Sequence, residues 1–470
     1  MKVLLINPPY SAYSPKESAI PPLGLARIAS TIRKKANVQV LDMACKEVLG
    51  KDPWGELLHT INLLKPNIIG IGPLVTSNVN KGLRIAKIIK SILPESKVTL
   101  GGPDPTFTYN KLLQNTNVDT VFIGESEKSF LAYVQSYNDA SLLKNINGIA
   151  FKLKGKIISN GRNYLTNKEF DSLPMPAWDL FPIEEYSEIA KKNNFEPYLP
   201  LESSRGCPLD CIFCSCTNIF SSKIRLRTSQ SIVNEITHNI NKYHIKRYVF
   251  NDDNVGIHIN HLLAIADKII KSQLDEVKFA ISSTLDSKLF SDLNHLLKIK
   301  AAGFDEIFMG CETIHEDAIK KVRKTSNPNL WAKNIKNAVE LCRRAGIASR
   351  TNWIIGLPTD TKDKLLQTIE FIKELKPDTA LMSLLQSYPG TYIDHEINKD
   401  ENKIGIHKLT ENPSDVVASK FDPTLYTQWL SSDEMIEIAY KFIYTLSPYF
   451  EANISGSPYY IFELWREQNN

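Results

Sequence analysis

Cys207, Cys211 and Cys214 occupy one short stretch near the middle of this chain of 470 residues. Thiolates bind iron–sulfur clusters, and cysteines this closely spaced in a loop can ligate three irons of one cube. Three protein ligands leave the fourth iron open to a molecule that carries an amine and a carboxylate. The spacing therefore predicts a [4Fe–4S] cluster with one iron available for chemistry.

A zinc site is the alternative interpretation, with Cys216 as a fourth thiolate, because tetrahedral zinc held by four cysteines is common. Zinc ribbons pair two C-x2-C knuckles, however, and this chain has no second knuckle. We therefore expect Cys216 to lie near the cluster without binding it. Cys45, Cys311 and Cys342 lie singly in apolar stretches, as small core residues do.

The composition is that of an ordinary globular protein with a sizeable core, 43% hydrophobic and 23% charged. A net charge of +4 is diluted over this length, so no nucleic-acid partner is expected. The apolar run at the N-terminus is too short for a signal peptide, and no stretch approaches the ~18 apolar residues of a membrane span. Seven cysteines, three of them crowded together, predict reduced thiols and a cytoplasmic location.

Alternating strand and helix patterns over residues 1–145 predict a doubly wound, Rossmann-like parallel sheet with helices on both faces. Strands are expected at 3–6, 38–42, 67–72, 97–100 and 120–123, and a helix at 22–32. Several strands end in glycine, which lets a ligand approach the carboxyl edge of an open α/β sheet: Gly72, Gly101, Gly102 and Gly124. The same glycines are equally suited to forming turns.

The remainder of the chain divides into three further regions. Residues 146–197 are expected to be a linker, because prolines interrupt any long helix there. Residues 198–394 predict a partial (β/α)6 barrel, with strands near 198–204, 246–251, 277–282, 304–310, 347–355 and 379–385. Residues 395–470 are expected to form a small, mostly helical region that shapes the substrate pocket, with helical spacing from Ser432 to Tyr444 and aromatic residues at 459–462.

The cysteine spacing, its Arg205-Gly206 lead-in and the barrel pattern behind it resemble the radical S-adenosylmethionine (SAM) superfamily. The resemblance implies that SAM chelates the open iron and that an electron enters its sulfonium. A 5′-deoxyadenosyl radical then removes hydrogen from a small-molecule substrate. An electron donor such as flavodoxin or ferredoxin is also implied.

Other barrel positions resemble the family more loosely. Asp252 and Asp253 follow the second strand, where relatives place groups that hold the amino group of SAM. Glu312, in Gly310-Cys311-Glu312-Thr313, is similar to a glutamate that contacts the ribose or the methionine moiety. Gly356 lies in a stretch that resembles the one whose backbone reads adenine.

Each of these residues also has a structural interpretation. Asp253 could cap the next helix, although carboxylates at barrel strand ends are usually site residues. Arg225 and Arg227 could grip a carboxylate bidentately or could be solvated charges. The stretch 385–391 resembles the proline–glycine turn after the last barrel strand, which is a structural feature.

The first 145 residues resemble the cobalamin-binding Rossmann domain that precedes the barrel in one large branch of the superfamily. The resemblance rests on Asn7-Pro8-Pro9, 21–24, Gly101-Gly102-Pro103 and Gly124-Glu125, which occur in family order. Most members of this branch methylate unactivated carbon or phosphinate phosphorus, and others rearrange or close rings. Polar groups for the amides and nucleotide tail of cobalamin are expected from Thr76, Ser77, Asn78, Asp104 and Glu125.

The chain departs from the best-known cobalamin pattern at its histidines. No D-x-H-x-x-G occurs, and Asp104 replaces the histidine of the family's glycine–glycine–proline–histidine. A histidine ligand to cobalt from that motif is therefore excluded, and bound cobalamin should be base-off. Tyr10 and Tyr13, in the loop from Pro8 to Pro22, could only cover the ring.

The favoured function is a cobalamin-dependent radical SAM methyltransferase acting on an unactivated carbon of a natural product or secondary metabolite. The alternative is a radical dehydratase, rearrangement or cyclisation enzyme that uses the first domain only as a scaffold. Methylation yields S-adenosylhomocysteine and 5′-deoxyadenosine, whereas the alternative yields only the latter. A cobalamin or iron–sulfur sensor would need no open iron, and a tRNA methylthiotransferase would need a second cysteine triad that is missing here.

Overall fold

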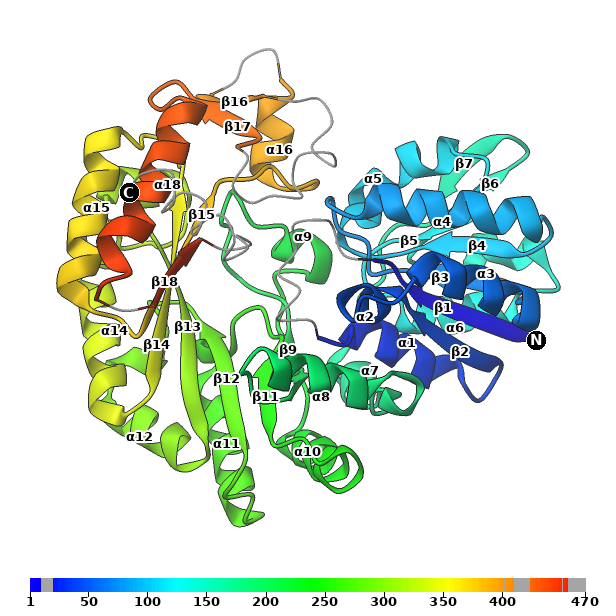
Figure 1. Ribbon diagram of the computed structural model, residues 1–470, viewed down its shortest axis with the longest axis horizontal. Helices are drawn as coiled ribbons and strands as arrows, with labels where there is room; N and C mark the ends of the chain where they lie inside the picture. The colour runs from blue at the N-terminus through cyan, green and yellow to red at the C-terminus, as the bar shows by residue number, and fades with distance from the viewer. Residues whose placement is uncertain (10–19, 400–402, 410–422, 450, 455–470) are drawn as a thin grey trace. The chain divides into compact units, whose positions relative to one another are not determined.

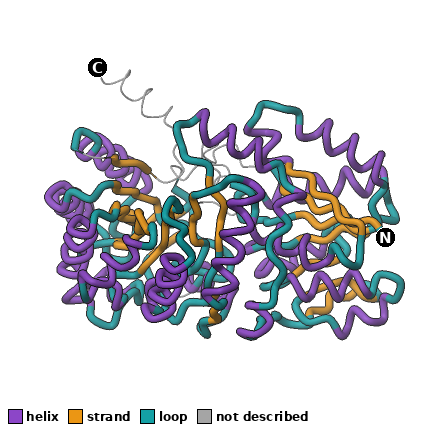
Figure 2. The backbone as a smooth tube through the Cα atoms, turned by 90° about the horizontal axis from the view of Figure 1, so that it is seen from below, coloured by secondary structure: helices purple, strands orange, loops and turns teal. Residues whose placement is uncertain are grey.

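The computed structural model describes residues 1–9, 20–399, 403–409, 423–449 and 451–454. Within it the chain forms two compact units, one made mostly of residues 1–200 and one mostly of residues 201–470. Each has its own sheet with helices around it (Figures 1 and 2). Tyr10, Tyr13 and the aromatic residues at 459–462 lie outside the described residues. Among the helices that are described, none combines the length and apolar content needed to cross a membrane.

A seven-stranded sheet in the order β2-β1-β3-β4-β5-β6-β7 organises the first unit. The pairs from β2 to β5 are parallel, as the sequence predicted. The parallel strands are β1 (Lys2–Asn7), β2 (Asn37–Asp42), β3 (Ile68–Ile71), β4 (Lys97–Leu100) and β5 (Thr120–Phe122). Placing β1 between β2 and β3 creates a point where the strand order reverses, and open α/β sheets bind ligands at the carboxyl side of such a point.

Helices flank this sheet and bury nearly continuous apolar strands, as parallel sheets require. Leu4, Ile69, Ile71, Val98 and Leu100 are buried in one core cluster. The helices are α1 (Leu23–Ile32), α2 (Met43–Val48), α3 (Pro53–Leu64), α4 (Val79–Ile92), α5 (Pro103–Gln114) and α6 (Glu127–Gln135). The predicted doubly wound architecture is confirmed.

Residues 146–197 are more ordered than the linker that the prolines indicated. β6 (Ile149–Leu153) and β7 (Lys156–Ser159) form an antiparallel hairpin that extends the first sheet. Lys154 and Gly155 both have positive φ, which is the backbone of a tight hairpin turn. The region also contains α7 (Asn167–Asp171) and α8 (Ile183–Lys192). The prediction missed the hairpin because the apolar run 149–151 is short and its turn lacks the usual Asn-Gly pair.

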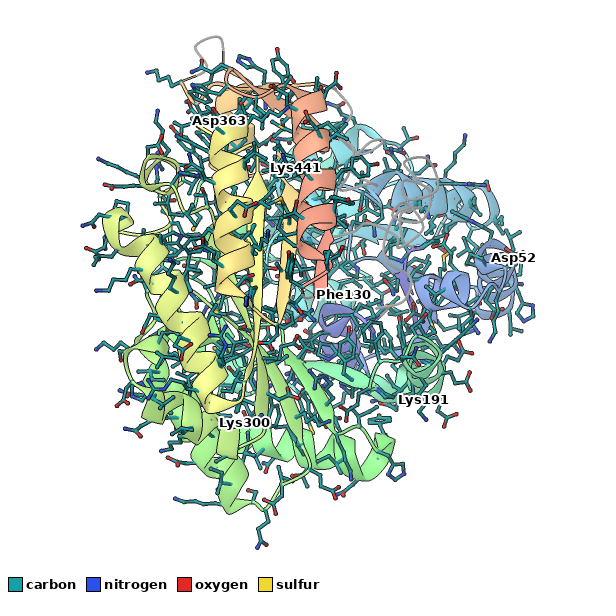
Figure 3. All side chains as sticks on the ribbon, turned by 60° about the vertical axis from the view of Figure 1, so that its left-hand side comes forward. Asp52, Phe130, Lys191, Lys300, Asp363 and Lys441 are labelled. Carbon is teal, nitrogen blue, oxygen red and sulfur yellow. The ribbon has the colours of Figure 1, made fainter. Side chains whose placement is uncertain are left out.

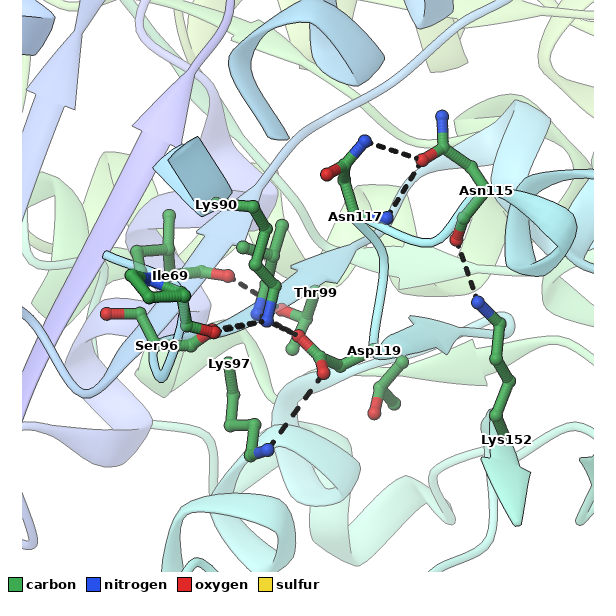
Figure 4. A network of polar contacts seen from close by, with 12 residues as sticks. Ile69, Lys90, Ser96, Lys97, Thr99, Asn115, Asn117, Asp119 and Lys152 are labelled. Atoms are coloured by element: carbon green, nitrogen blue, oxygen red, sulfur yellow. Dashed lines mark hydrogen bonds and ion pairs between the residues drawn. The ribbon is translucent and has the colours of Figure 1, made fainter. Parts of the chain in front are cut away.

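Polar contacts bind together the amino ends of the central strands of this sheet (Figure 4). The Lys90 ammonium donates to the carbonyl of Ser96 at 2.8 Å and pairs with Asp119, also at 2.8 Å. The other Asp119 oxygen lies 4.0 Å from the ammonium of Lys97. These contacts link the residues that precede β4 and β5 to helix α4.

Two loops cross at the carboxyl edge of this sheet. The amide of Leu74, after β3, donates to the carbonyl of Gly101, after β4, at 2.9 Å, and Asp104 N–H donates to the carbonyl of Leu74 at 3.2 Å. Gly102 has φ +132°, and a Cβ there would lie 2.4 Å from the Leu74 nitrogen. Only glycine permits this crossing, because both its backbone angle and its contacts exclude a side chain.

The second unit contains a seven-stranded sheet in the order β18-β15-β14-β13-β12-β11-β8. The pairs that link β11, β12, β13, β14, β15 and β18 in this order are parallel. Six strands match the predicted positions: β8 (Tyr198–Leu201), β11 (Arg247–Phe250), β12 (Lys278–Ser283), β13 (Phe304–Glu312), β14 (Ala348–Ile355) and β15 (Thr379–Leu384). The sheet is open, as a partial barrel requires, since β18 and β8 stand at its edges.

Neighbouring helices pack in chain order along the outer side of these strands (Figure 1). They are α10 (Ser229–Tyr243), α11 (Ile259–Lys271), α12 (Leu293–Ala301), α14 (Trp331–Ala345) and α15 (Lys362–Leu375). Tyr248, Phe250, Phe279 and Phe304 pack as an aromatic group at the first strands of the sheet, with 4.9 Å between the last two rings.

In the described part of the C-terminal region, α16 (Tyr392–Ile397) and α18 (Ser432–Leu446) are helices, and α18 confirms the predicted helix. Three short strands that the sequence did not predict accompany them. β16 (Ile406–Lys408) pairs with β17 (Leu425–Thr427), and β18 (Glu451–Ile454) adds a parallel strand beside β15. Figure 3 shows α15 and α18 running together, and Lys362 pairs with Glu437 between them at 2.7 Å. Short strands with weak alternation gave no sequence signal.

Replacing Gly102 by alanine should destabilise the first unit, because the new Cβ would collide with the backbone of Leu74. We expect the thermal unfolding midpoint of that unit to fall by several degrees, a loss of about 1–3 kcal/mol for a strained backbone position. Gly24→Ala is the matched control, since Gly24 lies in α1 with no atom near its Cβ position. Equal midpoints for the two variants would show that the crossing is not strained.

Candidate active site

The three predicted ligand cysteines lie in a loop whose two ends are paired. β9 (Ser204–Arg205) and β10 (Arg225–Leu226) form a short antiparallel ladder, with Arg205 opposite Arg225. Gly206 follows at φ +97°, and a Cβ there would lie 2.5 Å from the carbonyl oxygen of Lys223. The glycine before the first cysteine is therefore required for closing the loop.

Backbone hydrogen bonds hold the middle of the loop from two sides. Between the second and third cysteines, the amide of Ile212 donates to the carbonyl of Val322 at 3.2 Å. The carbonyl of Ile212 accepts from the amide of Ile393 at 3.1 Å. The Thr217 hydroxyl contacts the carbonyls of Cys207 and Leu209 at 3.2 and 2.9 Å. The loop is thus shaped by protein contacts before any cofactor is considered.

The sulfur atoms differ in their surroundings. Cys207 is buried, Cys211 is half-buried and Cys214 is exposed. Burial raises the pKa of Cys211 to about 12. Hydrogen bonding from the Cys216 thiol, assisted by its amide at 3.4 Å, lowers the pKa of Cys214 to about 7. Thiolates are the metal-binding form, and the surroundings of Cys214 favour its thiolate more than those of Cys211 do.

Three cysteines in one loop are a donor set that suits an iron–sulfur cube, because each thiolate binds its own iron. Among the residues that the structure describes, no three histidine, cysteine or carboxylate side chains converge as ligands of one metal ion. The Cys216 amide donates to the Cys214 sulfur at 3.4 Å, and the absence of Cys216 from the ligand set stays a prediction.

Asp252 and Asp253 follow β11 and both contact the cysteine loop or its entry. Asp252 is buried and accepts from the amide and hydroxyl of Ser203 at 2.8 and 2.6 Å, and from the hydroxyl of Ser204. Burial raises its pKa to about 7. Asp253 accepts from the amide of Gly206 at 2.8 Å, and burial raises its pKa as well. In the structure these carboxylates position the segment that carries the cysteines.

Glu312 ends β13 in an unusual backbone conformation. A register shift between Gly310 and Glu312 interrupts the pairing with β14, and Glu312 has φ +59°. The carbonyl of Cys311 accepts from the Thr313 amide at 2.7 Å and from the Trp331 indole at 2.8 Å. The carboxylate accepts from the ammonium of Lys324 at 2.7 Å. A strained non-glycine residue persists only where surrounding contacts impose its conformation, and such residues cluster at functional sites.

A third strand end forms a turn around a buried aspartate. After β14, Gly356 has φ +91°, and its amide and that of Leu357 donate to one oxygen of Asp360 at 3.1 and 2.9 Å. Asp360 is fully buried, and its other oxygen has no hydrogen-bond partner among the described residues. Burial raises its pKa to about 7. The turn predicted to read adenine is therefore held by one acid.

The two arginines after the cysteine loop have structural partners. Arg227 pairs with buried Glu235 at 2.7 Å and donates to the carbonyl of Glu202 at 2.7 Å. Arg225 donates to the carbonyl of Phe220. Arg205 and Glu202 form a further buried ion pair at 2.7 Å. These contacts make a rigid frame around the cysteine loop and favour the structural interpretation of Arg225 and Arg227.

Sequence reasoning missed Lys324 and Asp360, although both stand near predicted residues. In the sequence, the short helix α13 (Glu316–Lys321) separates Lys324 from Glu312, so no local pattern links the two residues. Asp360 belongs to Gly356-Leu357-Pro358-Thr359-Asp360, where its role depends on the positive φ of Gly356. A glycine followed by an aspartate four residues later was the only available signal.

In the first unit, the predicted ligand-binding residues line the carboxyl edge. Gly101, Gly102 and Gly124 are half-buried there, and Thr76 is buried in the loop after β3, beside half-buried Ser77. Among the described residues, a Cβ on Gly101 would meet only Phe122, at 3.7 Å. Glycines leave the backbone of these strand ends without side chains, which suits the approach of a large flat cofactor.

Polar side chains at this edge already have hydrogen-bond partners within the protein. Glu125 is buried and accepts from the amide of Leu165 at 2.9 Å. Asp104 is buried against its own helix, where one oxygen accepts from the Thr108 hydroxyl at 2.7 Å. The Thr106 hydroxyl accepts from the amide of Gly124 at 3.0 Å and donates to the carbonyl of Gly102. These contacts join the loops after β4 and β5 into one surface.

Comparison with known families agrees with this division. Residues 201–372 match the radical SAM superfamily, and residues 17–134 match the B12 binding domain. An uncharacterized methyltransferase of Pyrococcus horikoshii is 29% identical over 83% of this chain and 82% of its own length. The anaerobic magnesium-protoporphyrin IX monomethyl ester cyclase of Rubrivivax gelatinosus is 25% identical over 84% of this chain and 70% of its own.

Among solved structures, the radical S-adenosylmethionine methyltransferase TsrM from Kitasatospora setae has a similar fold. The TM-score is 0.73 at 16% identity, covering 87% of this chain and 80% of that one. That protein was solved with cobalamin and a [4Fe–4S] cluster bound. At this identity the likeness concerns the fold.

Asp360→Asn should change how stability depends on pH. Because burial raises the folded-state pKa from 3.8 to about 7, the folded chain keeps a proton that the unfolded chain loses. Unfolding free energy should therefore fall as pH rises from about 4 to about 7, by about 1.4 kcal/mol for each unit of pKa difference. Asparagine remains neutral, so the variant should lose this part of the decline.

The measurement is the thermal unfolding midpoint at a series of pH values. Asp363→Asn, in the first turn of α15, is the control because Asp363 is exposed. It should decline with pH as the parent does. A parent-like decline in Asp360→Asn would mean that Asp360 is already ionised at low pH.

Proposed function

Because the chain combines a radical SAM domain with a B12-binding domain, we propose that it is a cobalamin-dependent radical SAM methyltransferase. The cysteine loop is the observation that carries the proposal. It is closed by β9 and β10, held at Ile212 from two sides, and presents three free thiols. The proposed substrate is an unactivated carbon of a natural product or secondary metabolite.

Cys207, Cys211 and Cys214 would hold the [4Fe–4S] cluster. When bound, the cluster and cobalamin supply electron transfer to SAM and a carrier for its methyl group. The protein's own part is to keep the thiols in place and to leave the fourth iron without a protein ligand. Cys216, engaged with Cys214, supports this division of roles.

The polar strand ends of the second unit would hold SAM. Glu312 offers a buried carboxylate for the ammonium or ribose, and the turn at Gly356 offers backbone groups for adenine. Asp253 stands at the loop entry, where it can meet the amino group while it accepts from Gly206. Asp252 has its oxygens on Ser203 and Ser204, so its contribution is through the position of the loop.

The open carboxyl edge of the first unit would hold cobalamin through Thr76, Ser77, Gly101, Gly102, Gly124 and Glu125. The described loops of this edge contain no histidine, so cobalt would lack an imidazole ligand from them. Cobalt without an imidazole ligand is more easily reduced to the state that accepts a methyl group. Asp104, which stands where the family has its histidine, accepts a hydrogen bond from Thr108 of its own helix.

The names of the relatives support methyl transfer, and one of them also supports the alternative of ring closure without methylation. The Pyrococcus horikoshii relative and TsrM are both named as methyltransferases. The Rubrivivax gelatinosus relative is named as a cyclase, which favours radical chemistry without methylation. We also propose that flavodoxin or ferredoxin supplies the electron, in the cytoplasm, where seven unpaired cysteines stay reduced.

Glu312→Gln should weaken SAM binding while the cluster remains, because the amide cannot attract the ammonium of SAM as a carboxylate does. Equilibrium binding of SAM to reconstituted protein is the measurement. We expect an affinity loss of roughly tenfold, or about 1.4 kcal/mol. Glu316→Gln, at an exposed position in α13, is the control. An unchanged affinity would remove Glu312 from the site.

The function itself is tested by product analysis. Anaerobically reconstituted protein should hold about four irons per chain. Supplied with hydroxocobalamin, SAM and titanium(III) citrate, it should retain base-off cobalamin and form both S-adenosylhomocysteine and 5′-deoxyadenosine. Cys207→Ala, Cys211→Ala and Cys214→Ala should each abolish formation of 5′-deoxyadenosine.

Three results would change the conclusion. 5′-Deoxyadenosine alone, without retained cobalamin, would favour the dehydratase, rearrangement or cyclisation alternative. Bound zinc together with a Cys216→Ala variant as damaged as the other three would favour the zinc site. Full iron loading without either product would contradict a radical SAM enzyme.

A further inference from the structure

The hairpin formed by β6 and β7 returns the chain to the carboxyl edge of the first sheet. Phe122, at the end of β5, pairs with Ile149 at the start of β6. Ala150, the next residue of β6, pairs with Ser159 at the end of β7. Because both pairings are antiparallel, β7 runs in the same direction as β5. The residues after Ser159 therefore emerge at the edge that is proposed to hold cobalamin.

The segment after β7 is fastened to the end of β5. Asn163 pairs with Gly124 in an isolated parallel bridge. The amide of Leu165 donates to the carboxylate of Glu125 at 2.9 Å. The amide of Gly124 donates to the hydroxyl of Thr106, in the first turn of α5, at 3.0 Å. Gly124 is thus the point at which the segment after β7 and helix α5 meet.

A contact between a cation and an aromatic ring adjoins this meeting point. The guanidinium of Arg162 lies over the ring of Phe107, with 4.8 Å to the ring centroid. Arg162 directly precedes Asn163, and Phe107 directly follows Thr106. The aromatic face attracts the guanidinium and limits the conformations of its long side chain. Stacking engages the face of the guanidinium, whereas its N–H donors point outward in its plane.

The connections at this edge lack described basic side chains. No lysine or arginine occurs in the described residues that link β1, β3, β4 and β5 to the helices after them, which are 8–9, 20–22, 72–78, 101–102 and 123–126. Asp104 and Glu125 are buried there and accept hydrogen bonds from the protein. The described parts of these connections therefore offer an anionic ligand no positive side chain, whereas the segment after β7 brings Arg162 to the same edge.

We propose that Arg162 binds the phosphodiester in the nucleotide tail of cobalamin, an inference that rests on the proposed function. The phosphodiester carries a permanent negative charge, and in base-off cobalamin the tail extends away from cobalt. A planar guanidinium donates parallel hydrogen bonds to phosphate oxygens, which an ammonium does not. Phe107 holds the face of this guanidinium. Arg162 is therefore a contact to the tail, and the corrin ring is left to the glycine strand ends.

The test compares hydroxocobalamin with cobinamide, which has the same corrin ring but lacks the phosphate and the nucleotide. Each is equilibrated with the full-length chain by dialysis, and the bound fraction is read from the corrinoid absorbance. Arg162→Met should weaken the binding of cobalamin about tenfold and leave that of cobinamide unchanged, because only cobalamin carries the phosphate. Arg162→Lys should lose less affinity, because it keeps the charge.

Lys156→Met is the matched control. Lys156 is an exposed cation at the start of β7, whereas Arg162 follows the end of that strand. This variant should bind both corrinoids as the parent does. Phe107→Leu removes the stacking without removing a charge, and it should weaken the binding of cobalamin alone, by a smaller factor than Arg162→Met.

The comparison of the two corrinoids separates the possible outcomes. Parental cobalamin affinity in Arg162→Met would overturn the proposal, and so would an equal loss for both corrinoids, which would indicate damage to the ring site. Equal affinities of the parent chain for cobalamin and cobinamide would overturn it as well, because the tail would then make no contact. If Arg162→Met does not fold, Phe107→Leu decides by the same comparison. A parent chain that binds neither corrinoid would instead contradict the proposed function.

Discussion

Two backbone hydrogen bonds of Ile212 hold the cysteine loop, on which the proposed chemistry of the second unit depends. The amide of Ile212 donates to Val322 and its carbonyl accepts from Ile393, and both partners lie far away along the chain. A loop with three cysteines has many conformations, and a cluster needs one in which each thiolate meets a different iron. By fixing the residue between the second and third cysteines, the sheet and its connections settle that conformation before the cofactor arrives.

The same sheet brings the other functional groups to one end. Parallel registers from β11 to β15 align the strand ends that carry Asp252, Glu312 and Gly356. Three carboxylates there accept hydrogen bonds from the protein itself: Asp252 from serines, Asp253 from the amide of Gly206, and Asp360 from the amides of a turn. Burial raises the pKa of all three. The site is therefore rigid mainly because buried acids accept backbone amides.

Sequence reasoning predicted many of the elements well, because they have local signals. Apolar runs located β1–β5 and the six barrel strands. One short motif gave the three cysteines, whose role as cluster ligands stays a prediction. The β6–β7 hairpin and β18 were missed, since short strands depend on a sheet edge that already exists. Lys324 was also missed, because its link to Glu312 arises only when α13 folds back. Asp252 had a recognisable position, but no sequence signal showed that Ser203 and Ser204 occupy its oxygens.

We propose that the three cysteines leave one iron open for SAM. The most direct measurement is electron paramagnetic resonance (EPR) spectroscopy of the reduced cluster with unlabelled SAM and with SAM labelled with ¹⁵N at its amino group. We predict that SAM alters the cluster signal and that the ¹⁵N label changes the nitrogen hyperfine coupling, because the amine would bind the open iron. A spectrum that is identical with and without SAM, in protein shown to contain the cluster, would contradict the claim.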